Sequence, residues 1–567
     1  MKSAARILLV VSLLLSIILE SSLSASKRPV RAKHGMVVSA DELASKVGVQ
    51  ILKRGGTAVD AAVAVGFALA VTFPGAGNIG GGGFMVIRMA NGKTVTIDYR
   101  EKAPAASYRD MFLDEEGNFV PAKSQEGYLS SGVPGSVAGL LYALEKHGTM
   151  RRKAILQPAI DLARKGFRIK YEFAEELRGE IEDLRKYPAS RGIFTRNGEP
   201  YTEGDLLVQK DLAETLRRIQ KYGRNGFYGG KTANLIVAEM KRGGGLITHA
   251  DLKAYRAVER PPIRGTYKGY DVISMGPPSA GGIALVEMLN LLEPFNTGAN
   301  GFASSKTISL MVEAMKLAYA DRAEFLGDSD FFPVPVEKLI SKEYAAERMR
   351  LLDTLKATPS RDISHGPIPL NQKTETTHYS VVDRWGNAVA VTTTLNGWFG
   401  NKIVVEGAGF FLNNEMDDFS AKPGVPNLYG LVGSDANSVE PNKRMLSSMT
   451  PTIVLRGGQP FMVLGSPGGA TIITTVLQVL LNVVEHRMNI AEAIDAPRVH
   501  HQWLPDTLIY EKRGLPIDVL DNLDRRGYHL RERGGTQGRV EGIMIDREKK
   551  LLYGATDPRG YGAAVGY

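Results

Sequence analysis

Three polar side chains about two-thirds of the way along the chain have the types and spacing that nucleophilic chemistry requires. Thr376 precedes a β-prone run at 379–382, and Thr394 and Asn396 lie in a second run, 389–396, in which residue types alternate. A threonine hydroxyl becomes a useful nucleophile only when a base takes its proton. Paired threonines are also a common structural feature of β-sheets, so this pattern alone leaves both interpretations open.

The segment between the two runs predicts a hairpin and its register. Its sequence, Asp-Arg-Trp-Gly-Asn, places Gly386 where a turn needs a positive φ. Pairing Asp383 with Asn387 puts Thr376 opposite Thr394 on the neighbouring strand. A hydroxyl at the start of one strand would then face a hydroxyl on the next.

The elements before this hairpin are predicted to be helices followed by strands. Residues 40–53 and 58–71 predict helices, and the second is apolar nearly all round, so it should be buried. The glycine-rich stretch 75–80 matches the dinucleotide pattern G-x-G-x-x-G, but a helix precedes it and predicted strands at 84–89 and 94–99 follow it. A dinucleotide site needs the opposite order. The glycines are therefore expected to allow close backbone packing beneath a site.

Charged and polar candidates for a functional site lie in three further places in the sequence. Arg100 ends a predicted strand, where arginine is usually a surface charge. Glu415 and Asp418 are three apart in an acidic stretch, and a loop that caps a helix or binds calcium explains them as well as a functional site does. Ser447 and Ser448 are adjacent in a predicted loop. None of these residues defines a function by itself.

Two loops and one turn complete the candidate features. Gly468 and Gly469 lie between a predicted strand and a long apolar helix, where backbone N–H groups can bind an anion or a developing oxyanion. Residues 422–433 form a Pro- and Gly-rich loop around Tyr429. Residues 357–375 combine prolines with polar residues, which predicts an exposed and mobile segment ending just before the first strand of the hairpin.

Composition excludes several classes of function. The 567 residues carry a formal net charge of +9, but acidic and basic residues are interspersed, so we expect no nucleic-acid partner. The chain has no cysteine, which rules out disulfides, thiolate catalysis and cysteine-based zinc sites. The nine histidines show no metal-ligand spacing. We therefore expect neither a metal nor another cofactor.

The first residues have the layout of a secretory signal peptide. Lys2 and Arg6 precede an uncharged run at 7–19, and small residues follow at 22–26. The run is short for a membrane-spanning helix. We therefore expect a signal peptide over residues 1–25 and a periplasmic or secreted mature protein, with an uncleaved membrane anchor as the alternative.

Together these motifs resemble the γ-glutamyltranspeptidase family from about residue 35 to the end of the chain. The resemblance rests on Glu-Thr-Thr-His-Tyr-Ser-Val-Val-Asp before Thr-Leu-Asn, on the lid-like loop and on the Ser-Pro-Gly-Gly turn; 498–503 also matches, without an assigned role. It implies an α+β fold, a four-layer αββα sandwich of the N-terminal nucleophile hydrolase type. It also implies cleavage of the Glu375–Thr376 bond into a large subunit, 26–375, and a small catalytic subunit, 376–567.

The resemblance further implies an activity and a role for each candidate residue. The activity is transfer of the γ-glutamyl group of glutathione and related compounds to water, an amino acid or a peptide. The implied roles are Thr376 as nucleophile, Thr394 as its orienting partner, Gly468 and Gly469 as the oxyanion hole, Arg100, Ser447 and Ser448 as ligands of the α-carboxylate, Asn396, Glu415 and Asp418 as ligands of the α-ammonium group, and Tyr429 as the latch of the lid.

Two alternatives stay open at this point. One is a related acylase of the same fold, of the cephalosporin or glutaryl acylase type; the lid-like loop argues against it. The other is an uncleaved, non-catalytic periplasmic binding protein, and the intact set of Thr376, Thr394 and the two glycines argues against that.

Overall fold

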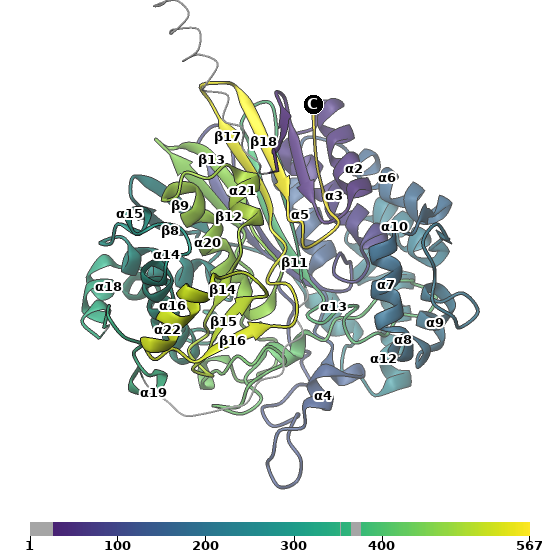
Figure 1. Ribbon diagram of the computed structural model, residues 1–567. Coiled ribbons are helices and arrows are strands. Elements are labelled where there is room, and N and C mark those ends of the chain that lie inside the picture. Colours follow the sequence, from purple (N-terminus) through teal and green to yellow (C-terminus); the bar gives the residue numbers. More distant parts are fainter. Residues whose placement is uncertain (1–26, 352, 364–375) are drawn as a thin grey trace, which may run out of the picture.

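The computed structural model describes residues 27–351, 353–363 and 376–567 (Figure 1). Two seven-stranded antiparallel sheets lie at its centre, and helices lie on both sides of the pair. The predicted signal peptide and the Glu375 side of the predicted cleavage site lie outside the described residues. The α+β class predicted from the sequence is confirmed.

The strands of each sheet come from distant parts of the chain. Sheet I has the order β1 (Val30–Ala32), β18 (Leu551–Thr556), β17 (Glu541–Asp546), β13 (Gln459–Leu464), β12 (Thr452–Arg456), β9 (Tyr270–Ser274) and β8 (Ile263–Tyr267). Sheet II has the order β19 (Ala563–Gly566), β2 (Met36–Ser39), β10 (Thr377–Val382), β11 (Ala388–Thr394), β3 (Gly82–Arg88), β4 (Thr94–Asp98) and β7 (Val258–Arg260). Smaller sheets contain β14 (Val499–His500), β15 (Leu508–Glu511) and β16 (Leu530–Arg533), and β5 (Phe167–Arg168) and β6 (Leu206–Leu207).

The helices divide into two groups (Figure 1). The group on the side of sheet II contains α2 (Glu42–Lys53), α3 (Ala58–Thr72), α4 (Pro121–Gln125), α5 (Ser136–His147), α6 (Arg152–Lys165), α7 (Tyr171–Gly179), α8 (Ile181–Arg185), α9 (Pro188–Phe194), α10 (Lys210–Tyr222), α11 (Asn225–Tyr228), α12 (Gly230–Gly243) and α13 (His249–Ala254). The group on the side of sheet I contains α14 (Gly281–Leu292), α15 (Thr297–Asn300), α16 (Ser305–Phe325), α17 (Val336–Leu339), α18 (Lys342–Met349), α19 (Ser360–Ile363), α20 (Ile472–Val484), α21 (Ile490–Asp495) and α22 (Ile517–Arg525).

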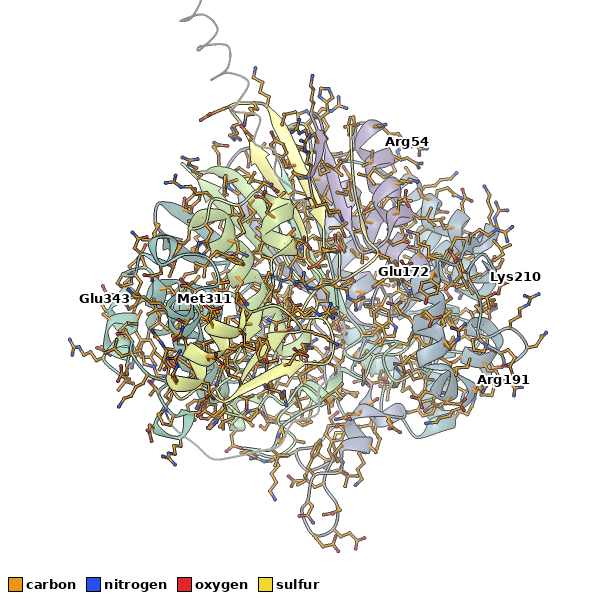
Figure 2. All side chains as sticks on the ribbon, in the orientation of Figure 1. Arg54, Glu172, Arg191, Lys210, Met311 and Glu343 are labelled. Carbon is orange, nitrogen blue, oxygen red and sulfur yellow. The ribbon has the colours of Figure 1, made fainter. Side chains whose placement is uncertain are left out.

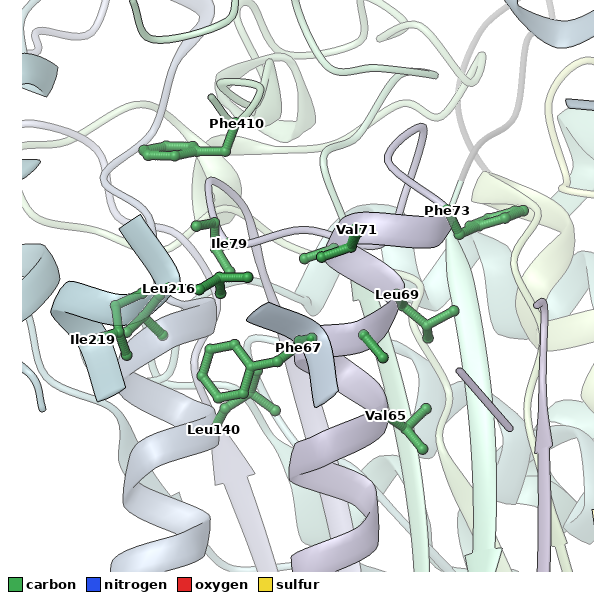
Figure 3. Packing of buried hydrophobic residues seen from close by; sticks show 14 of the residues in the cluster. Val65, Phe67, Leu69, Val71, Phe73, Ile79, Leu140, Leu216, Ile219 and Phe410 are labelled. Carbon is green, nitrogen blue, oxygen red and sulfur yellow. The ribbon is translucent and has the colours of Figure 1, made fainter. Parts of the chain in front are cut away.

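Helix α3 is the centre of the core beside sheet II. All of its residues are buried, as its uniformly apolar sequence predicts. Figure 3 shows Phe67 beside Leu140 of α5, with Leu216 of α10 in the same cluster. The helix begins with a capping box of Thr57 and Asp60. Because α3 is buried on all sides, it packs firmly against β10 and β11, the hairpin next to Thr376.

The two faces of strand β11 pack into two different parts of the core. Val389 and Val391 pack into the core on the helix side, whereas Ala388 and Ala390 pack into the core between the sheets. Successive side chains of a strand point to opposite faces, so a strand buried on both faces needs apolar residues throughout. The strands predicted from this pattern are confirmed.

Many charged side chains lie at the surface of the molecule, although some are buried. Figure 2 shows Arg191, Lys210 and Glu343 at its rim, and all three are exposed. In the residues that the structure describes, no helix is long and apolar enough to cross a bilayer.

The sequence predicts an exposed segment over 357–375, and the described part, 357–363, fits this only in part: Pro359, Arg361 and Asp362 are exposed, whereas Ser360 and Ile363 are buried. Ser360 is fully buried. Its N–H donates to Asp506 Oδ2 (2.8 Å), and its carbonyl accepts from Trp503 Nε1 (3.0 Å). A polar segment without periodicity gave no sign of these contacts because its backbone makes them with side chains from far along the chain. The rest of the segment lies outside the described residues.

Candidate active site

The hairpin of β10 and β11 has the register expected from its turn. Asp383 N–H donates to Asn387 O (3.1 Å), Gly386 has a φ of 89°, and Thr377 pairs with Thr393. Thr376 therefore stands opposite Thr394, and its Oγ1 lies 3.4 Å from Thr394 Oγ1. The carboxylate of Asp383 also accepts from the N–H of Ala58 at the start of α3 (2.8 Å). The turn thus ties the hairpin to the buried helix.

Thr394 is held in place from several directions. The N–H of Asn396 donates to Thr394 Oγ1 (2.8 Å), and Asn396 has a φ of 74°, so the chain turns sharply there. Asn78 Nδ2 donates to the carbonyl of Thr394 (2.8 Å). A Cβ on Gly81 would lie 2.0 Å from the same carbonyl oxygen, so only glycine fits. The glycine-rich stretch therefore packs beneath the site, as the sequence predicts.

Gly468 and Gly469 form the turn that opens α20. Their φ values are 139° and 52°, and the 3₁₀ turn Gly469–Thr471 leads directly into the helix. Thr471 N–H donates to Gly468 O (2.9 Å). A Cβ on Gly469 would lie 2.4 Å from the ring of Tyr429. Gly469 and Ile472 at the start of the helix line the same cavity as Thr376 and Thr394, so the partial positive charge of the helix start suits a developing oxyanion there.

Arg100 lies at the centre of a buried charge cluster. Its guanidinium hydrogen-bonds to Glu415 and to Asp418, and it also donates to the carbonyls of Met445 and Leu446, at 3.2 Å each. Arg100 is fully buried. Burial alone would lower the pKa of Arg100, but the two carboxylates outweigh it and raise the pKa, so the guanidinium stays charged.

The carboxylates of this cluster are less acidic than usual. Burial raises the pKa of Glu415 to about 7, an effect that Arg100 partly offsets. Burial also raises the pKa of Asp418, again against Arg100. The adjacent Glu101 is fully buried, and burial together with the charge of Glu415 raises its pKa well above the usual range. One cation therefore faces a group of carboxyls that compete for it.

Residues 422–433, the lid segment, close over this cluster. Tyr429 OH donates to the carbonyl of Asn396 (2.7 Å), and Asn427 Nδ2 donates to Asp418 Oδ1 (3.1 Å). Leu428 N–H donates to the carboxylate of Asp417 (2.8 Å), and burial raises the pKa of Asp417 to about 6. Tyr429 is only 4% exposed. The lid is thus held by its central residues.

Ser447 and Ser448 lie beside the cluster on a loop that runs along the start of α14. Ser447 N–H donates to Pro278 O (2.9 Å), and Ala280 N–H donates to Ser447 O (2.7 Å). Both serines are buried, at 2% and 7% exposure. Their hydroxyls therefore belong to the interior of the site and not to a surface loop.

These parts enclose one cavity. It leaves about 20 Å³ for the centres of water-sized molecules, little more than one water needs. A ligand as large as an amino acid therefore enters only when the lid or side chains move. Of the site residues predicted from the sequence and described here, all but Gly468 line it. They are Arg100, Thr376, Thr394, Asn396, Glu415, Asp418, Tyr429, Ser447, Ser448 and Gly469.

Sequence reasoning did not assign roles to two polar residues behind this cavity. Gln502 Nε2 donates to the lid carbonyls of Gly430 (2.9 Å) and Tyr429 (3.3 Å). Arg322 Nη2 lies 3.5 Å from Ser448 Oγ. The stretch 498–503 was part of the family resemblance, which could have pointed to Gln502, whereas Arg322 lies in α16, which carries none of the motifs identified in the sequence.

Comparison with known proteins supports one family. A family model described as Gamma-glutamyltranspeptidase matches residues 44–567. The sequence is 54% identical over 532 residues to the glutathione hydrolase proenzyme of Escherichia coli (strain K12), covering 94% of this chain and 91% of that protein.

Solved structures agree with this match. A cephalosporin acylase from Bacillus halodurans superposes with a TM-score of 0.84 at 27% identity, covering 96% of this chain and 98% of that one. A γ-glutamyltranspeptidase chain from Helicobacter pylori has a TM-score of 0.56 at 49% identity and covers 57% of this chain and 93% of that one. With its candidate threonines, glycine turn and charge cluster gathered around one cavity, the chain belongs to the γ-glutamyltranspeptidase family.

Proposed function

We propose that this protein is a self-processing glutathione hydrolase and γ-glutamyltransferase. The observation that carries the proposal is the placement of Thr376 Oγ1, 3.4 Å from Thr394 Oγ1, in a cavity that also contains the Arg100 cluster and Gly469. Its αββα sandwich would then be of the N-terminal nucleophile type and be assembled from two fragments, residues 26–375 and 376–567. Residues 1–25 would direct the precursor to the periplasm or outside the cell.

Self-cleavage would generate the catalytic base. In the precursor the nitrogen of Thr376 is an amide and cannot accept a proton. The Thr376 hydroxyl attacks the carbonyl carbon of Glu375, the C–N bond breaks, and the acyl group moves to Oγ as an ester. Water then hydrolyses that ester and leaves a free α-amine. Such an amine has a pKa of about 7.7–8.0, which suits a general base near neutral pH.

The mature site would use the same atoms on the donor. The amine takes the proton of the Thr376 hydroxyl, whose oxygen attacks the γ-carbonyl carbon, and the amide bond to the leaving amine breaks as that amine gains a proton. Thr394 orients the nucleophile, and the N–H groups of Gly468 and Gly469 stabilise the oxyanion. Water or an acceptor amine then releases the γ-glutamyl group from the ester.

The charge cluster would select the amino-acid end of the donor. An incoming α-carboxylate replaces Glu415 and Asp418 at the Arg100 guanidinium, which can bind it through two hydrogen bonds. The α-ammonium group then binds the two released carboxylates, with Asn396 beside them. Ser447 and Ser448 complete the carboxylate site. These remote contacts position the reacting carbonyl, so they affect turnover as well as binding.

A cephalosporin or glutaryl acylase activity is the second candidate, because the Bacillus halodurans acylase has a similar fold over nearly the whole chain. A glutaryl group carries the terminal carboxylate but lacks the α-ammonium group. It would therefore displace Glu415 and Asp418 from Arg100 without offering them another cation. That imbalance of buried charge favours a γ-glutamyl donor.

Intact mass under denaturing conditions, followed by parallel assays with γ-glutamyl and glutaryl donors, tests this proposal. We expect two fragments, the smaller running from Thr376 to Tyr567, and a preference for the γ-glutamyl donor. Thr376→Ala should leave a single uncut chain without activity. Two fragments in that variant would remove Thr376 from processing, and an uncut, inactive wild-type protein would favour a non-catalytic binding protein.

A further inference from the structure

The last turn of α16 brings a buried arginine to the edge of the site. Arg322 is only 5% exposed. Among the described residues, its one hydrogen bond from the side chain is the long contact to Ser448 Oγ (3.5 Å), and its Nε has no hydrogen-bond partner. A buried polar group left largely unpaired costs free energy and calls for an explanation.

Two arginines that are more deeply buried than Arg322, each 1% exposed, have carboxylate partners. Arg444 lies 3.2 Å from Asp98, and Arg498 lies 2.6 Å from Asp557. Within the described part of the chain, no carboxylate lies within 4.0 Å of the Arg322 guanidinium. Burial lowers the pKa of Arg322, and Tyr319 and Asp418 only partly offset this. The surroundings therefore favour the arrival of an anion nearby.

The position of Arg322 is fixed by its neighbours in the same helical turn. Tyr319 OH donates to the carbonyl of Ala470, directly after the glycine turn. The carbonyl of Ala323 accepts from the N–H of Ser434 (3.0 Å), just beyond the lid segment. The turn is thus connected to the oxyanion region, to the serine loop and to the lid. A side chain held in this way can orient a partner without losing much conformational entropy on binding.

We propose that Arg322 is a positioning residue for the α-carboxylate of the donor, acting through Ser448. The guanidinium donates to Ser448 Oγ, so the hydroxyl directs its own proton toward the carboxylate bound at Arg100. The bound carboxylate in turn supplies the negative charge that the buried guanidinium lacks. This inference rests on the proposed function and adds a second cation, behind the serines, to its carboxylate site.

A purely structural role makes a different prediction. Arginine near the C-terminus of a helix is stabilised by the helix dipole, and that contribution does not depend on the donor. Selectivity for the carboxylate distinguishes the two roles. The test compares a γ-glutamyl anilide with the same anilide whose α-carboxyl group is an amide, and measures the ratio of the two kcat/KM values.

We expect wild type to prefer the carboxylate donor and Arg322→Gln to reduce this preference by about tenfold, as for loss of a hydrogen bond to a charged group. Arg322→Lys should retain part of it. Arg88→Gln is the matched control, because Arg88 is 9% exposed and donates to two backbone carbonyls, those of Met89 and Gly458, at the far end of β3. That control should keep the full preference.

A double-mutant cycle with Ser448→Ala tests the route of action. Arg322→Gln should change the preference far less in the Ser448→Ala background than in wild type. An unchanged preference in Arg322→Gln, additive effects in the cycle, or loss of self-cleavage in both Arg322 variants would each overturn the inference. If wild-type protein did not turn over γ-glutamyl donors, the proposed function itself would fail, which is a separate result.

Discussion

Gln502→Met tests whether the lid is held from behind. Gln502 is 4% exposed, and its NH₂ group faces the carbonyls of Tyr429 and Gly430. Its Oε1 lies 3.0 Å from His500 Nε2, and His500 Nδ1 lies 2.9 Å from Thr474 Oγ1 on α20. Because the amide must donate to the lid, Nε2 of His500 carries the proton. Burial lowers the pKa of His500 to about 3, so this neutral arrangement persists across the working pH range.

The free energy by which Gln502→Met destabilises the closed lid follows from the two hydrogen bonds that the lid loses. A neutral hydrogen bond contributes about 0.5–1.5 kcal/mol net, and one of this pair is long, so the loss is about 2 kcal/mol. That free energy raises the population of open lid relative to closed lid by up to about 30-fold. If donor binding needs the closed lid, KM rises by a factor approaching this value. The value of kcat should change little, since the hydroxyl pair is untouched.

Steady-state kinetics with a γ-glutamyl anilide and limited proteolysis within residues 422–433 measure this effect. Gln209→Met is the matched control, because Gln209 is 1% exposed and donates to the carbonyl of Val71 (2.8 Å), away from the lid. Both variants lose a buried amide, but only Gln502→Met should raise KM and expose the lid. Equal kinetics and equal proteolysis in the two variants would refute the reasoning.

Two further predictions concern the charge cluster. Arg100→Lys should raise KM for γ-glutamyl donors strongly, by about tenfold or more, because lysine cannot bind a carboxylate through a planar fork; an unchanged KM would show that the carboxylate binds elsewhere. The second concerns pH. In wild type, KM should fall as pH rises through about 7, because Glu415 must lose its proton to bind the ammonium group and burial holds its pKa near that value. Glu415→Gln cannot titrate, so a KM profile with the same slope in that variant would assign the pH dependence to another group, such as the nearby Asp418 or Glu101.

Local chemistry explains why the hairpin could be predicted from the sequence. The turn needs a positive φ at Gly386 and a side chain such as Asp383 to accept the N–H groups of Trp385 and Asn387, at 2.9 and 3.0 Å. These requirements can be recognised from the residue types of only five consecutive positions. Once the turn is fixed, pairing proceeds by single steps, and it places Thr376 opposite its partner.

Contacts between distant segments could not be recognised from the sequence in this way. Ser360 is buried because Asp506 and Trp503 bind its backbone groups, which have no residue-specific signature. The long helix α16 carries buried residues around most of its surface, so its sequence did not single out Arg322. Periodicity reports which face of an element is buried, but not which neighbour covers it. The residues behind the cavity lining, such as Arg322, could therefore be identified only from the structure.

The arrangement of strands explains how a cut before Thr376 could leave the fold intact. Strands β2, β3, β4 and β7 come before that residue and β10, β11 and β19 after it, and sheet II places β10 and β11 between β2 and β3. A newly formed chain end normally frays. Here Thr377 pairs with Thr393, Tyr379 pairs with both Val391 and Ser39, and Thr376 is 4% exposed. Neighbours on both sides would thus hold the new amine beside its own hydroxyl, so folding has to precede cleavage for the base to form in the right place.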